Sequence, residues 1–282
     1  MYNVTFKNDN GKRFYFGTKG KNVFDMDLGN GVSVNIGTSQ GFGQIGETLQ
    51  TQSVGGRTIN VKGSLFGNIP SGKHTLRSAI APFSSGILIF QDKYYTRVYV
   101  KETPTFSSKK NDGKFSLQFY APYPFFYSVD KKGASTGTVT PMFRFPVNYG
   151  TPHKFGERST VRTADIINDG DVKVPFEVSI QTIGFSRDIT ITNIKTEQVL
   201  KINGSITAGE EIKIYRDKNN ILRAELRNGA ETTDIISRID ESSDFFELDA
   251  GENIVNAKAE EGGSSLVITL SFNSAVVNLY ED

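Results

Sequence analysis

The sequence predicts a mainly β protein with two domains, one short helix in the first and a β-sandwich in the second. The chain has 282 residues, which is long for a single compact core. It contains 28 glycines and 21 phenylalanines but no tryptophan, a composition typical of many short strands joined by glycine turns. Apolar and polar residues alternate in one segment after another, and this period of two indicates half-buried strands.

The first domain begins with a predicted hairpin, in which the strand Met1–Phe6 turns at Asn10-Gly11 into the strand Arg13–Phe16. The same alternation predicts further strands at Val32–Ile36, from Arg57 onward, and at Gly86–Gln91, Tyr94–Lys101 and Lys114–Tyr120.

One short segment between these strands has the period of a helix. Leu76, Ala79, Ile80 and Phe83 stand at i, i+3, i+4 and i+7, which predicts a short helix with one apolar stripe. Pro82 makes this helix hard to extend. Because its neighbours in sequence are strands, we expect a sheet to cover the stripe.

The segment 37–56 is polar and glycine-rich, and we expect it to be a long mobile loop or arm. Gly41, Gly43 and Gly46 form the pattern G-x-G-x-x-G after a strand, as in dinucleotide-binding proteins. That fingerprint needs a helix at the third glycine and an acidic residue about twenty positions later, where this chain has Phe66. A polar excursion of this length is commonly functional, and we predict a contact role.

A second glycine-containing turn is the hairpin tip predicted at Ser107–Gly113. Lys109 and Lys110 lie in this tip, where they are either solvated or directed at a pore or partner, because charge of one sign can line a channel.

The second domain is predicted to follow a linker at 131–140 and to span 141–282, leaving 1–130 as the first domain. From Arg162 onward, turn residues recur about every eight to twelve positions, which is typical of a β-sandwich. The predicted strands are Thr163–Ile167, Pro175–Gln181, Ile189–Ile194, Gln198–Ile202, Ile212–Arg216, Ala224–Arg227, Phe245–Leu248, Asn253–Ala259 and Ser265–Tyr280.

Composition excludes several kinds of chemistry. The formal net charge is +1, from 32 Lys and Arg against 31 Asp and Glu, so charge gives no argument for nucleic acid or an anionic membrane as the main partner. Cysteine is absent, which excludes disulfides, thiol catalysis and cysteine-bound zinc. We find no apolar stretch of the roughly 18 residues that a membrane span requires.

No catalytic motif is evident, and the sequence predicts neither an enzyme nor a cofactor or metal site. His74 has no second histidine at helical spacing, and His153 lies in a predicted loop beside a proline. Acidic residues concentrate between Asp240 and Glu261, where a glycosidase-type carboxylate pair is the weaker alternative to a solvated surface.

Two sets of ordered motifs resemble one known family. The first runs GRTI-x-V-x-G-x-L, I-A-P-F, R-V-x-V, P-x-F and F-x-L-x-F-x-A-P-x-P-F-F between residues 56 and 126. The second begins N-D-G-D and P-F-E-V-x-I near residue 168 and continues to G-E-N-I. Together they resemble the distal tail proteins of long-tailed bacteriophages.

This resemblance implies a ring-forming N-terminal domain, a β-sheet or split barrel, and a galectin-like C-terminal sandwich. It also implies a homo-hexamer at the tail tip or baseplate of the virion, assembled in the host cytoplasm, that joins the tail tube protein to the tail-tip hub. A receptor-binding protein and the tape-measure protein are further implied partners. The resemblance also implies that DNA passes through the lumen without sequence-specific binding, and that the protein does not contact a membrane. The resemblance implies that the segment 37–56 is an arm that reaches a neighbouring subunit. Its candidate contact residues are Gly41, Phe42, Gly43, Gln44, Ile45, Gly46 and Glu47.

A carbohydrate-binding module of the tail tip, which helps host-surface adsorption, is the alternative function. Galectin-like sandwiches often bind sugars, and tyrosine or phenylalanine can stack on them. Alternation in the second domain directs its large apolar residues inward, however, and leaves few aromatic residues outside.

Overall fold

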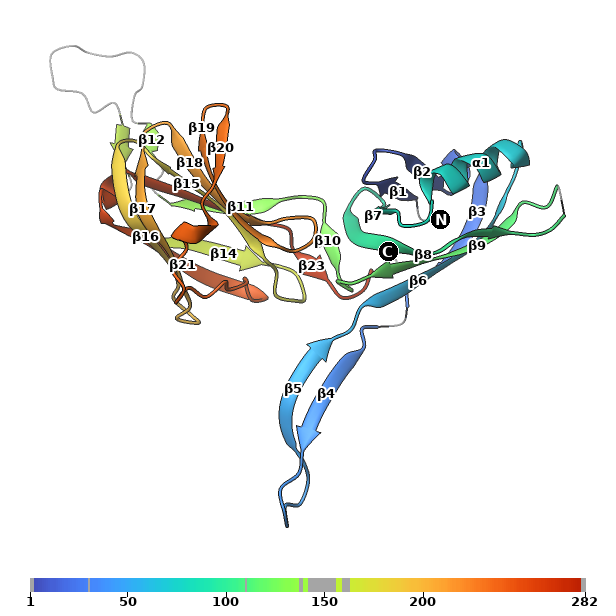
Figure 1. Ribbon diagram of the computed structural model, residues 1–282, viewed down its shortest axis with the longest axis horizontal. Helices are drawn as coiled ribbons and strands as arrows, with labels where there is room; N and C mark the ends of the chain where they lie inside the picture. Colours follow the sequence, from blue (N-terminus) through green and yellow to red (C-terminus); the bar gives the residue numbers. More distant parts are fainter. Residues whose placement is uncertain are drawn as a thin grey trace. The chain divides into compact units, whose positions relative to one another are not determined.

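The computed structural model describes residues 3–29, 31–109, 111–136, 139–141, 156–158 and 163–279. They form a mainly β structure of antiparallel sheets, which confirms the predicted fold class (Figure 1). Two compact units are present, one of Met1–Asp130 with Ala275–Asp282 and the other of Lys131–Ser274. Within the described residues, no helix is both long and apolar enough to cross a membrane.

The first unit is built on one nine-stranded sheet with the main order β2-β1-β7-β8-β9-β6-β3. The strand β10 adds to it beside β8, and β23 adds beside β10. Its strands are β1 (Val4–Asn8), β2 (Arg13–Phe16), β3 (Asn22–Asp27), β6 (Arg57–Leu65), β7 (Ser85–Phe90), β8 (Tyr94–Phe106), β9 (Lys114–Ala121), β10 (Phe126–Ser128) and β23 (Ala275–Val276).

This sheet curls until its two terminal strands, β2 and β3, meet. The rings of Phe6 on β1 and Phe119 on β9 lie 5.0 Å apart, although β7 and β8 separate their strands in the sheet. The rings of Phe16 and Phe24 join β2 to β3 at 5.6 Å. The buried Asn22 side chain accepts a bond from the Gly17 amide and donates to the Tyr15 carbonyl, both at 2.9 Å, so the 3-10 turn Thr18–Gly20 closes the curl.

The helix α1 (Ile69–Ala79) packs its apolar stripe against this sheet. Asn68 caps its first turn by accepting a hydrogen bond from the Ser71 amide. Leu76, Ala79 and Ile80 are buried as predicted. The prediction is wrong for Phe83, which lies beyond the helix end with its side chain fully exposed.

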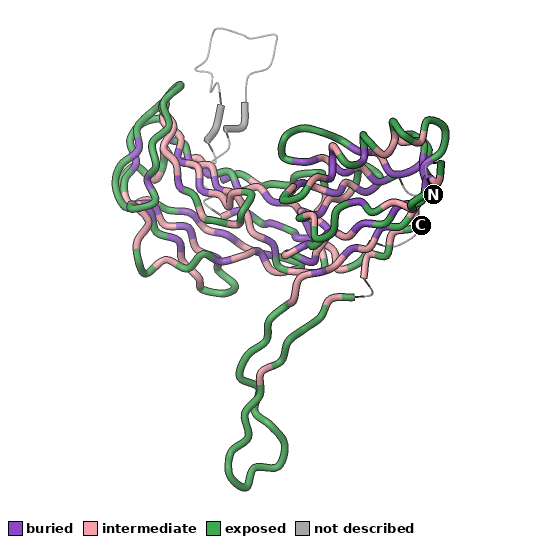
Figure 2. Tube along the Cα trace, turned by 45° about the vertical axis from the view of Figure 1, so that its right-hand side comes forward, coloured by how far each residue is buried: buried purple, intermediate pink, exposed green. Residues whose placement is uncertain are grey.

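The second unit contains two large sheets, and along their strands buried residues alternate with more exposed ones (Figure 2). The six-stranded sheet has the order β11-β22-β15-β18-β19-β20, and the four-stranded sheet has the order β14-β21-β16-β17. Their strands are β11 (Lys132–Thr136), β14 (Thr163–Asn168), β15 (Phe176–Thr182), β16 (Phe185–Asn193), β17 (Val199–Thr207), β18 (Glu210–Arg216), β19 (Leu222–Asn228), β20 (Glu231–Asp234), β21 (Gly251–Glu261) and β22 (Leu266–Phe272). A separate pair joins β12 (Val139–Pro141) to β13 (Gly156–Arg158).

Three details of this unit differ from the sequence predictions. The predicted linker at 131–140 instead contributes the edge strand β11, which pairs with β22. Phe245–Leu248 is not a strand, and only an isolated bridge from Leu248 to Val174 is formed there. The predicted final strand ends at Phe272, and the chain then pairs β23 with β10 of the first unit.

Candidate assembly interface

The predicted arm is a β-hairpin with a sheet of its own. The strands β4 (Val34–Ser39) and β5 (Thr48–Val54) pair only with each other among the described residues. The hairpin is closed at its base by a 2.9 Å hydrogen bond from the Gly55 amide to the Ser33 carbonyl, and Figure 1 shows it extending from the start of β6. The segment is therefore an ordered extension, and the expectation of a loop is wrong in that respect.

A β-bulge gives this arm one apolar face. Val34 pairs with Val54 and Ile36 lies opposite Gln52, so these residues share a face. The register then shifts between Gly37 and Thr38, and Thr38 pairs with Leu49. Without the shift, Gln50 would lie opposite Thr38, and Leu49 would point to the other face. The bulge thus gathers Val34, Ile36, Leu49 and Val54 on one side.

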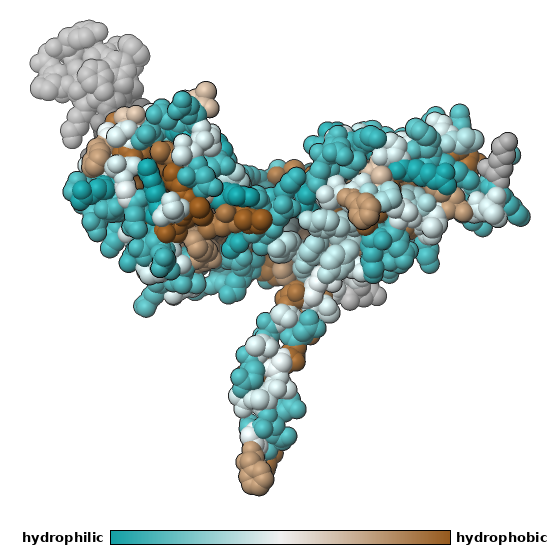
Figure 3. All heavy atoms as spheres, viewed as in Figure 1, coloured by the Kyte–Doolittle hydropathy of each residue, from teal (hydrophilic) through white to brown (hydrophobic). Residues whose placement is uncertain are grey.

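The apolar side chains of the arm are exposed to solvent. Val34, Ile36, Leu49 and Val54 are 53%, 61%, 53% and 48% exposed. At the tip, Phe42 and Ile45 are completely exposed, and Figure 3 shows apolar atoms both at the tip and near the base of the arm. Large exposed apolar surfaces with a polar surround mark interaction sites.

The predicted contact residues Gly41–Glu47 form the tip that joins the two strands. The Gln44 amide donates to the Gly41 carbonyl at 3.1 Å, and the Gln44 side chain accepts from the Gly41 amide at 2.9 Å. Gly43 and Gly46 have φ values of 72° and 86°, which glycine adopts without strain. The three glycines therefore serve a hairpin turn, and no helix follows them as a dinucleotide site would require.

Arg57 secures the base of the arm within the first unit. Its guanidinium donates to the Val277 carbonyl at 2.8 Å and lies 4.8 Å from the centre of the Phe126 ring. Burial lowers the pKa of this guanidinium, which nevertheless stays charged because the unperturbed value is so high. The sequence pattern gave Arg57 only as the first residue of a strand.

The predicted basic tip between β8 and β9 is described only in part. Lys109 is exposed, and its carbonyl accepts a hydrogen bond from the Asp112 amide at 3.1 Å. Lys110 lies outside the described residues. The Lys114 amide donates to the Asp112 carboxylate, and this bond is the main cause of the lowered pKa of Asp112.

Asp240, the first of the late acidic residues, is held in a turn by hydrogen bonds to its carboxylate. The Asp240 carboxylate accepts hydrogen bonds from the Ser242 hydroxyl and amide and from the Asn203 side chain. These bonds, led by that of the Ser242 hydroxyl, lower the pKa of Asp240 to about 2. A general acid needs a raised pKa, so Asp240 is suited to hold a turn and not to donate a proton.

Asp240 is expected to titrate in the folded protein near pH 2, which NMR of its carboxyl carbon measures. The pKa in the folded protein lies below the ordinary value of 3.8, so the hydrogen bonds to the Asp240 carboxylate stabilise the fold at pH values above 3.8. This stabilisation is lost as the pH falls toward about 2. In Ser242→Ala, the pKa should move up toward 3.8. A wild-type pKa already near the ordinary value would contradict this assignment.

Of the two histidines, only His74 lies within the described residues. His74 is exposed on α1, and His153 lies outside the described residues. Among the residues that the structure covers, no group of three or more histidine, aspartate or glutamate side chains is arranged to hold a metal ion.

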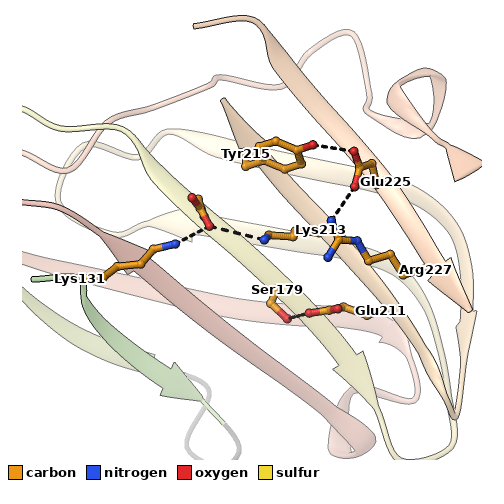
Figure 4. Close-up of polar contacts among 8 residues, drawn as sticks. Lys131, Ser179, Glu211, Lys213, Tyr215, Glu225 and Arg227 are labelled. Atoms are coloured by element: carbon orange, nitrogen blue, oxygen red, sulfur yellow. Dashed lines mark hydrogen bonds and ion pairs between the residues drawn. The ribbon is translucent and has the colours of Figure 1, made fainter. Parts of the chain in front are cut away.

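The outer face of the six-stranded sheet carries a ladder of charged side chains (Figure 4). Glu177 lies 2.6 Å from Lys131 and 3.8 Å from Lys213. Glu225 accepts from the Tyr215 hydroxyl at 2.6 Å and from Arg227 at 2.9 Å. The Tyr215 bond, followed by that of Arg227, lowers the pKa of Glu225, while the same bond raises the pKa of Tyr215. These groups are thus paired with one another.

Comparison with known proteins found one matching domain model and several similar solved structures. Residues 169–275 match the model described as siphovirus-type tail component, C-terminal domain. Among solved structures, the chain is similar to the Dit protein of phage SPP1, described as a paradigm of the hub adsorption apparatus in phages that infect Gram-positive bacteria. The TM-score is 0.67 at 14% identity, covering 98% of this chain and 99% of that one. No match was found among curated proteins.

Two structures of the phage P2 baseplate in its activated conformation, with Ca and with Sr, each give a TM-score of 0.49. Their identities are 12% and 13%, with 96% of this chain and 98% of each matched chain covered. The matched domain model covers residues 169–275, and the similarity to the SPP1 protein shows a shared fold over almost the whole chain. Both findings bear out the resemblance to distal tail proteins that the motifs predict.

Proposed function

We propose that this chain forms a ring at the tail tip, in which the arm of each subunit contacts the next. The observation that carries the proposal is the exposed apolar face of the hairpin β4–β5. A closed ring needs two different complementary surfaces on each subunit, and a projecting arm supplies one of them. Six copies, and a position between tail tube and hub, follow from the family resemblance.

The arm itself supports a contact function on physical grounds. A two-stranded hairpin is marginally stable alone and gains stability when its apolar face packs against another element. All seven residues of β5 are exposed, so none of the described residues of the subunit supplies that element. A neighbouring subunit would bury the apolar face and pair the open strand edges.

The proposed role is structural and not enzymatic. The partners would be other copies of the chain, the tube and hub proteins, and through them the receptor-binding and tape-measure proteins, with the virion tail as location. We do not propose carbohydrate binding, because the polar side chains on the outer face of β15, β18 and β19 already pair with one another.

Replacing Ile36 and Leu49 together by serine is expected to abolish ring formation while leaving the subunit folded. Both side chains are more than half exposed, so their loss costs the monomer little, whereas an interface would lose two buried apolar groups. Light scattering and electron microscopy with the tube and hub proteins present measure assembly, and thermal unfolding measures folding.

The matched control is Asn35→Ser with Ser53→Ala, on the opposite face of the same strand pair. This variant should assemble as the wild type does. Rings of normal stability from Ile36→Ser with Leu49→Ser would show that the apolar face is not the contact surface.

A further inference from the structure

The turn after α1 holds an aromatic residue in an unfavourable backbone conformation. The Ser84 amide donates to the Ala81 carbonyl at 3.2 Å, which closes a four-residue turn with Pro82 and Phe83 at its centre. Phe83 has a φ of 60°. A turn with proline first and a positive φ second is the type that normally carries glycine or asparagine at the second position.

Phe83 stands apart from the other residues of this kind. Positive φ values outside glycine occur in the described chain also at Lys21, Gln91, Asp92, Asp188, Glu197 and Asn220. Those six are polar, whereas Phe83 is large and apolar, a class for which positive φ is a genuine outlier. Its side chain is 103% exposed, so burial within the subunit does not compensate for the strain. Strain that the fold does not explain indicates function.

The strand register connects this turn to the base of the arm. Ser85, two residues after Phe83, pairs with Tyr99, Tyr99 pairs with Tyr120, and Tyr120 pairs with Thr58. Cross-strand partners share a face, so Tyr99 and Tyr120 lie side by side, and they are 37% and 40% exposed. Thr58 is the second residue of β6, the strand that follows the arm. The Tyr120 hydroxyl also lies close to the base of the arm, because a Cβ added to Gly56 would be 2.3 Å from it.

We propose that Phe83, Tyr99 and Tyr120 form an aromatic strip that extends the arm's contact surface, with a second copy of this chain as partner. The inference rests on the proposed ring function. A neighbour that packs against the arm also reaches the adjoining strip, because the strip ends at the arm's base. Aromatic side chains are frequent anchors at the centres of interfaces, and Phe83 is held outward by its turn.

The test is Phe83→Gly in the full chain. Glycine adopts the positive φ without strain, and the lost ring makes no buried contact, so thermal unfolding should begin at an equal or higher temperature. Assembly measured by light scattering, with the tube and hub proteins present, should need about tenfold more protein or worse, as for loss of an interface anchor. A gain in stability combined with a loss of assembly is the expected signature.

Two controls isolate the role of the ring. Asn220→Gly relieves the same backbone conformation in the second unit and should leave assembly unchanged. Phe83→Tyr keeps an aromatic ring and should retain most of the assembly.

Three outcomes would overturn the inference in distinguishable ways. If Phe83→Gly assembles like the wild type while the Ile36 and Leu49 variant does not, the strip is not a contact and the ring function stands. If Phe83→Gly unfolds at a lower temperature, the strain argument is wrong. If the wild-type chain forms no assembly under any of these conditions, the proposed function fails together with this inference.

Discussion

Phe119→Ala is expected to lower the free energy of unfolding of the first unit by about 3–5 kcal/mol, the usual cost of removing a buried phenylalanine. The Phe119 side chain is completely buried, and its ring meets that of Phe6 across the curled sheet at 5.0 Å. The truncation therefore removes a contact between strands that are not neighbours and leaves a cavity where the sheet closes on itself. Urea unfolding followed by tyrosine fluorescence measures the change.

The matched control for this variant is Tyr123→Ala, which removes an aromatic side chain that is 41% exposed in the same unit. Its effect should be below about 1 kcal/mol, since surface substitutions away from special features cost little. Equal losses in the two variants would mean that the contact between Phe6 and Phe119 does not stabilise the curled sheet.

The sequence pattern predicted most strands because their burial follows local alternation. Arg13–Phe16 was predicted with both ends correct, and β9 exceeds its prediction by one residue. The edge strand β11 was not predicted, because Thr136 is its one buried residue and its sequence therefore shows no apolar alternation. The pairing of β23 with β10 joins residues about 150 positions apart, which no local pattern can indicate.

The sequence predicted the segment that contains the candidate contact surface, but it did not predict which side chains form the exposed apolar face. Contact residues were expected at the tip, whereas the structure adds an apolar face along both strands. Leu49 and Val54 are an odd number of positions apart, so a regular strand would direct them to opposite faces. They share a face only because of the bulge, which alternation does not indicate. Phe83 matched the helical period by position alone, because periodicity takes no account of the turn that Pro82 imposes.

The side chain of Asn168, in the N-D-G-D sequence of a turn, links several segments of the second unit by hydrogen bonds. Its side chain is 1% exposed, at the end of β14. The amide nitrogen donates to the carbonyls of Val172 at 2.9 Å, Leu248 at 3.2 Å and Asp249 at 3.3 Å. The amide oxygen accepts from the Gly170 nitrogen at 3.1 Å. The Asn168 side chain thus stabilises its own turn and also binds Leu248 and Asp249, which precede β21. Those two residues have no strand pairing except the bridge between Leu248 and Val174.

Asn168→Ala is accordingly expected to destabilise the second unit by about 2–4 kcal/mol, because the four hydrogen bonds of one buried side chain are lost together, at about 1 kcal/mol each. Hydrogen exchange should show the loss first at the Val174 and Leu248 amides, which form the bridge between the two fastened segments. Asn219→Ala, at an exposed turn of the same unit, is the control and should leave exchange at these amides unchanged. Unaltered protection in Asn168→Ala would show that the bridge, and not the Asn168 side chain, holds the segment in place.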